Sequence, residues 1–156
     1  MEQKQLADLE IKCRKMPQLR TFVTFKDFAN KPLAVAKPLS FIQRKSLNKL
    51  FVSCLELKIC TGRYMHQIEA ERLCKVSNIC TEQSLVESEC HFLLACPAYN
   101  ELRQAWLSKL VLPENFVHLS NPEKLKVFFN IAENLKPSAQ YIVDAFNMRS
   151  RVLLKL

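Results

Sequence analysis

The sequence predicts a mainly α-helical protein, and two observations carry this prediction. The chain of 156 residues contains a single glycine, Gly62, although tight hairpins and nucleotide-cradling loops depend on glycine. Apolar residues also recur at the helical spacings of three and four over much of the chain. The scarcity of glycine excludes Rossmann and P-loop sites, and the spacing favours packed helices.

Residues 1–39 are expected to form a basic helical arm and linker. Apolar positions among charges predict a helix over Met1–Met16, which Pro17 would terminate. Gln18–Phe28 suits a second helix, although the alternation in TFVTF also suits a short strand. Two prolines mark 31–39 as a linker to a helical domain over 40–156.

The domain is predicted to open with a capped helix. Ser40 and Gln43 have the spacing of a capping box, and apolar residues then follow a core pattern over Phe41–Ile59. We expect this helix to break at Gly62, within Thr61–Tyr64.

The rest of the chain alternates between a loop and helices. Residues 74–86 are polar and aperiodic and predict a loop, whereas 98–111 has a helical core face. Asn121 and Pro122 predict the start of a helix that ends near Leu135, and Ser138 is the predicted cap of a last helix that ends near Leu154. These last two helices are expected to pack as an antiparallel pair whose charges are all exposed.

The formal charge of +8 is concentrated in the first half of the chain. Up to Arg72 there are fourteen Lys and Arg against seven Asp and Glu, and after it nine against eight. Such asymmetry suits a polyanion such as RNA or DNA, bound by non-specific phosphate contacts, although dispersed lysines also occur as a simple solvated face. The candidate phosphate contacts are Arg44, Lys45, Lys49 and Arg63; Tyr64 is either a stacking group or a core aromatic.

The seven cysteines are an odd number, and neither a secretory segment nor an apolar run of membrane-spanning length accompanies them. The sequence therefore predicts a soluble intracellular protein, nuclear or cytoplasmic, whose thiols are core residues or metal ligands instead of disulfides.

The segment Glu87–Arg103 carries the chemistry. His91 and Cys96 lie close together in sequence where Pro97 would stop a helix, which is a plausible place for a metal ion. A metal would also pin the preceding loop at its two ends. The alternative is a buried amphipathic helix with two small apolar cysteines.

The chain resembles the zinc-binding C-terminal region of non-LTR, LINE-type retrotransposon reverse transcriptases and related animal proteins. The segments that carry the resemblance are TGRY at 61–64, AERLC ending at Cys74, VESECHFLLACPAYNELR at 86–103, NPEKLKVFF and AFNMRSR. In that family the suspected ligands are two Cys separated by two residues, then a His, then a Cys. The resemblance implies Cys74, His91 and Cys96 as ligands.

The second family Cys falls on Ser77, and serine is a poor zinc ligand near neutral pH. Either Cys80 becomes the fourth ligand, or the site is weakened or empty; Cys90 is a further candidate, although it adjoins His91. A filled site would be a structural, tetrahedral zinc centre in an irregular, zinc-knuckle-like loop at 74–96.

The resemblance also implies a function. The polymerase and endonuclease segments of such elements have no counterpart here, so we expect no enzymatic activity but a zinc-stabilised accessory module that binds RNA or DNA, or a degenerate copy of one. The alternative is a metal-free helical module that binds a protein partner through an apolar groove. No membrane association is expected.

Overall fold

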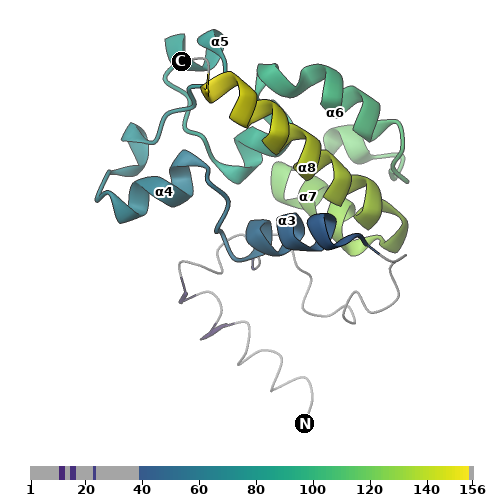
Figure 1. Ribbon diagram of the computed structural model, residues 1–156. Coiled ribbons are helices and arrows are strands. Elements are labelled where there is room, and N and C mark those ends of the chain that lie inside the picture. Colours follow the sequence, from purple (N-terminus) through teal and green to yellow (C-terminus); the bar gives the residue numbers. More distant parts are fainter. Residues whose placement is uncertain (1–10, 13–14, 17–22, 24–38, 155–156) are drawn as a thin grey trace.

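A computed structural model describes residues 39–154, together with 11–12, 15–16 and 23, and its described part is mainly helical (Figure 1). The predicted fold class, a helical domain with a Cys/His group in its middle, is confirmed. The predicted arm of residues 1–39 and its two helices lie almost entirely outside the described residues. The helices are α3 (Phe41–Phe51), α4 (Lys58–Tyr64), α5 (Asn78–Glu82), α6 (Asn100–Leu107), α7 (Asn121–Asn130) and α8 (Ala132–Leu153).

Helix α8 is the centre of the packing. It contacts α3, α6 and α7, and Figure 1 shows it running across the molecule. Its Tyr141 ring lies flat on Trp106 of α6, with ring centroids 4.2 Å apart, and Phe128 of α7 lies against the same indole at 4.4 Å. These large aromatic contacts hold the three helices together.

Helix α3 begins as predicted and ends earlier. Ser40 and Gln43 form the capping box, and the Gln43 side chain also donates to Gln140 of α8 at 2.9 Å. The helix stops at Phe51 instead of Ile59, because Ser53 adopts a left-handed conformation with φ of 49° and the Cys54 amide turns back to Lys49. The later apolar residues therefore pack from a turn and from α4.

The prediction that Gly62 breaks a helix was wrong, since this residue lies inside α4. A Cβ atom at Gly62 would stand 2.6 Å from Cγ of Arg72. The Arg72 guanidinium then donates to the carbonyls of Gln67 and Ile59, at 2.6 and 3.1 Å. Glycine is needed here for close packing against Arg72, not for a turn.

The predicted boundaries of the last two helices were also wrong. Helix α7 has Ser120 as its N-cap, whose amide donates to Glu123 at 2.8 Å, and it ends at Asn130. Helix α8 starts at Ala132, six residues before the predicted cap. Ser138 is buried within α8, where its hydroxyl accepts from the Trp106 indole and donates to the Phe128 carbonyl, both at 3.3 Å. Its partners come from other helices, which the sequence pattern cannot show.

No helix in the described part of the chain combines the length and the apolar character needed to cross a membrane.

Candidate metal centre

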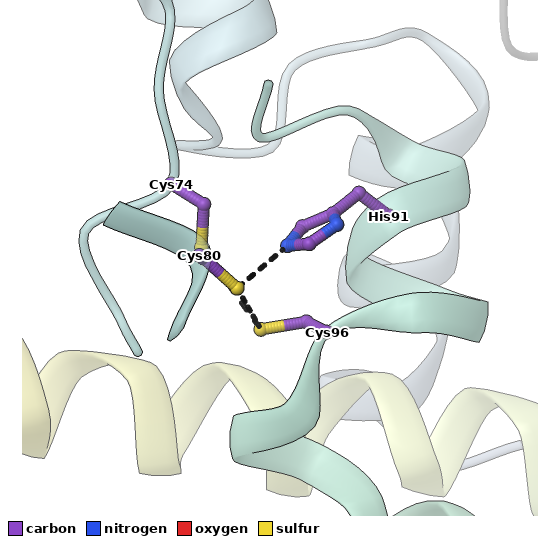
Figure 2. A group of neighbouring side chains, drawn as sticks. All are labelled: Cys74, Cys80, His91 and Cys96. Carbon is purple, nitrogen blue, oxygen red and sulfur yellow. Dashed lines mark hydrogen bonds between the residues drawn. The ribbon is translucent and has the colours of Figure 1, made fainter. Parts of the chain in front are cut away.

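Three cysteines and one histidine meet in the middle of the domain. Cys74 precedes α5, Cys80 lies in α5, and His91 and Cys96 lie at the two ends of a π-helical turn (Figure 2). Their ligand atoms all lie within 4.8 Å of one another. The four side chains point toward a common centre, so they can hold a metal ion.

The spacing of these atoms suits a tetrahedral ion. Cys74 Sγ and Cys96 Sγ are 3.9 Å apart, Cys80 Sγ and Cys96 Sγ 3.8 Å, and Cys80 Sγ and His91 Nε2 3.3 Å. Zinc–sulfur bonds of about 2.3 Å at tetrahedral angles place two sulfurs about 3.8 Å apart. The edges present here are close to that value.

The group is closed to solvent. The three cysteines are at most 1% exposed, and His91 is 8% exposed. None of the six described cysteines forms a disulfide, as the sequence predicted for thiols that are core residues or ligands. Four protein ligands in a buried group are typical of structural metal sites, whereas catalytic zinc sites keep one position open.

The segment between Cys74 and His91 is closed by backbone pairing. Leu73 and Val86 form an isolated antiparallel bridge, and the Cys74 amide donates to the Leu85 carbonyl at 2.8 Å. Inside this loop, α5 turns Cys80 inward, and the Leu85 amide donates to the Cys80 carbonyl at 3.0 Å. The loop predicted for 74–86 is thus present, but it contains a short helix that the polar sequence did not reveal.

The π-helical turn His91–Ala95 brings the other two ligands together. In an α-helix, residues five apart are separated by about 500° of rotation and point about 140° away from each other. Here the Cys96 amide donates to the His91 carbonyl at 2.7 Å, so one wider turn spans these five residues. The sequence predicted ligation at the end of a helix, but not this widened turn.

Arg103 holds the end of that turn and was missed as a site residue by the sequence analysis. Its buried guanidinium donates to the carbonyls of Leu93 and Cys96, at 3.1 and 2.6 Å, and to Asn100 Oδ1 at 2.7 Å. A planar fork of donors suits such a multiple contact. The signal in the sequence was an arginine beside the apolar positions of 98–111.

Charge in the group is unevenly distributed. A hydrogen bond from the Cys96 thiol lowers the pKa of Cys74 to about 4, and the same bond raises the pKa of Cys96. Burial raises the pKa of Cys80. Without a cation, two of the three thiols therefore keep their protons, and a divalent ion would replace those protons on binding.

Ser77 and Cys90 do not belong to the group of four. Ser77 is half-buried and is the N-cap residue of α5, and a hydrogen bond from its side chain acts to lower the pKa of Cys80 against the larger effect of burial. Of the alternatives left open by the sequence, the geometry therefore favours Cys80 as the fourth ligand.

A buried ion pair anchors the start of the Cys/His segment to α8. Glu87 accepts from Arg149 at 2.8 and 3.0 Å and from the Lys58 amide at 2.7 Å, and both charged side chains are almost fully buried. The expectation that the last helices carry only exposed charges was therefore wrong for Arg149. Its spacing from Ala145 and Ile142 on the buried face of α8 was the available signal.

The five candidate nucleic-acid contacts do not form one surface. Arg44, Lys45 and Lys49 line a shallow groove on α3. Arg63 is half-buried in α4 and donates to the Ser53 carbonyl at 3.4 Å, while Tyr64 is 76% exposed and lies outside the groove. The core-aromatic alternative for Tyr64 does not hold.

Comparisons with protein-family models, curated proteins and solved structures found no match. The resemblance to LINE-type reverse transcriptases therefore stays a prediction, and what the centre does must be argued from its own residues.

Proposed function

We propose that this protein is a non-catalytic, zinc-stabilised module that binds nucleic acid, similar in role to the C-terminal region of a retrotransposon reverse transcriptase. The observation that carries the proposal is the convergence of Cys74, Cys80, His91 and Cys96 within 4.8 Å.

The chemistry of the donors supports zinc. Three thiolates and one imidazole form a borderline-soft set, which suits zinc better than the oxygen-seeking ions magnesium and calcium. With four protein ligands there is no coordination position for substrate, so the ion would stabilise the fold and not act as a Lewis acid.

Nucleic acid is supported by charge. The chain carries a formal charge of +8, and the groove on α3 brings together Arg44, Lys45 and Lys49. Clustered cations on an exposed helix face contact phosphates without reading sequence.

The zinc proposal is tested by the metal content of protein purified under reducing conditions without a metal-affinity tag. We expect one zinc per chain in the unmodified protein and almost none in Cys96→Ser. Cys54→Ser is the matched control, because Cys54 is exposed and outside the group, and it should retain the metal. A metal-free unmodified protein that also fails to take up zinc on titration would refute the proposal.

The nucleic-acid proposal is tested by binding of a labelled oligonucleotide at increasing salt. Phosphate contacts release counterions, so the logarithm of affinity should fall linearly with the logarithm of salt concentration. Lys45→Ala and Lys49→Ala should each reduce that slope, while Lys126→Ala, an exposed lysine of α7, should not. Binding that ignores salt would exclude phosphate contacts.

One observation favours the alternative, a helical module that binds protein. Tyr64, Met65 and Ile68 are 76%, 67% and 64% exposed around the end of α4. Exposed apolar groups that lie close together mark interaction sites. Under this alternative, Ser or Ala at Cys74 and His91 should leave the thermal midpoint unchanged, because no metal would hold the fold.

A further inference from the structure

The outward face of α3 carries a groove of about 480 Å³. It is lined by residues that recur at spacings of three and four, namely Phe41, Arg44, Lys45, Asn48, Lys49 and Val52. The opposite face of the helix buries Gln43, Leu47 and Leu50 against the domain. The groove is thus one continuous stripe along a helix that the core holds in place.

An aromatic ring lies at one end of this stripe. Phe41, the first residue of α3, is 70% exposed, and Val52 at the other end is 39% exposed. A large ring left this open gains nothing from the protein core. The flat face of a nucleobase would cover it, because every base can stack on an aromatic side chain.

Cations flank the ring on the same stripe. Arg44 is fixed beside the groove by its bond to the Leu39 carbonyl at 2.6 Å. Lys45 and Lys49 lie one helical turn apart, about 6 Å along the axis, a spacing that suits successive phosphates of one extended strand. Lys49 also lies 3.8 Å from Glu56, but both side chains are largely exposed and such pairs are weak.

We infer that the α3 groove binds single-stranded nucleic acid, with an unpaired base stacked on Phe41 and the backbone phosphates along Arg44, Lys45 and Lys49. The inference rests on the proposed nucleic-acid function and adds the strand type. A duplex could contact the same cations, but its bases are already stacked on each other and cannot cover the ring. An acidic peptide would use the cations without needing a flat aromatic face.

The experiment measures binding of the metal-loaded full chain to a fluorescent oligothymidine and to a duplex of equal length at one low salt concentration. The variants are Phe41→Ala and, as the matched control, Ile42→Ala, because Ile42 is also highly exposed (61%) and lies outside the groove. We expect Phe41→Ala to weaken single-strand binding about tenfold, and to change duplex binding by less than about twofold. Ile42→Ala should change neither.

The outcomes separate the two proposals. If both oligonucleotides bind equally and Phe41→Ala matches Ile42→Ala, the inference fails while nucleic-acid binding stands. If polyglutamate displaces the oligothymidine at equal charge and Phe41→Ala has no effect, the groove is a site for acidic peptides and the inference also fails. If neither oligonucleotide binds, the proposed function fails with it. Circular dichroism of both variants shows that the α3 change leaves the fold intact.

Discussion

Cys80 and Ser77 lie three residues apart at the start of the Cys/His segment, and only Cys80 points into the buried group. Six residues separate Cys74 from Cys80, which is longer than the two-residue gap of the resembled pattern. The short helix α5 spans that longer gap and turns the Cys80 thiol toward His91.

Replacing Cys80 with Ser should therefore weaken metal binding, whereas Ser77→Ala should leave it intact. A hydroxyl is a poor ligand for zinc, so we expect at least about a tenfold loss of affinity for Cys80→Ser. Competition with a chromophoric chelator measures both variants. Equal losses in the two would mean that Ser77 helps to bind the ion.

Arg149 should be more important for stability than its surface-like sequence context suggests. Arg149→Met leaves the Glu87 carboxylate buried without its partner, which costs about 3–5 kcal/mol of unfolding free energy. Urea denaturation measures this cost. The double variant Glu87→Gln with Arg149→Met should be less destabilised than Arg149→Met alone, since it removes the stranded charge. Additive losses would contradict this interpretation.

At the scale of secondary-structure elements, close packing overrides helix propensity in α4. Gly62 lies inside this helix, where alanine would ordinarily be preferred by about 1 kcal/mol. The Arg72 side chain occupies the space in which a Cβ atom would lie, and it bonds to carbonyls at both sides of the contact. Helix α4 is thereby tied to the chain that leads into Cys74.

Gly62→Ala should consequently destabilise the protein by about 1–3 kcal/mol, the usual cost of overpacking. In an Arg72→Ala background the same change should become neutral or stabilising, because the space is vacated and only propensity remains. Thermal denaturation of the four proteins decides the sign. Stabilisation by Gly62→Ala in the unmodified background would show that Arg72 moves away at little cost.

At the scale of the whole molecule, two regions share the work of holding the fold. The helices α3, α6 and α7 pack on α8 through apolar and aromatic contacts, while the segment 74–96 has short helices, an isolated bridge and the Cys/His group. The two meet at Phe92, whose ring lies 5.4 Å from Phe146 of α8, and at the Glu87–Arg149 pair.

Removal of the metal by a chelator under reducing conditions should loosen the second region first. Hydrogen exchange followed by mass spectrometry should show faster exchange for 74–96, and largely retained protection for Ala139, Ile142 and Ala145 in α8. Protein with Cys54→Ser serves as the control and should respond as the unmodified chain does. Equal loss of protection along α8 would mean that the metal holds the entire domain.

The sequence was sufficient for features that depend on local pattern. The capping box of Ser40 and Gln43, the helical class and the Cys/His grouping follow from spacing and residue type. The sequence analysis failed where a polar or small residue has a distant partner: Ser138 bonds to α6 and α7, Gly62 packs under Arg72, and Arg149 pairs with Glu87. The π-helical turn was also missed, because its hydrogen bond to His91 is fixed partly by Arg103 from another helix.

The Glu87–Arg149 pair also sets an order of events during synthesis. The four candidate ligands leave the ribosome within a stretch of 23 residues, so a metal can be captured while the chain is still growing. Glu87, in contrast, meets its partner only after 62 further residues have been made. Until then its carboxylate must stay in water, which keeps this end of the nascent segment from closing. The last turns of α8 thus complete a domain whose metal centre is assembled first.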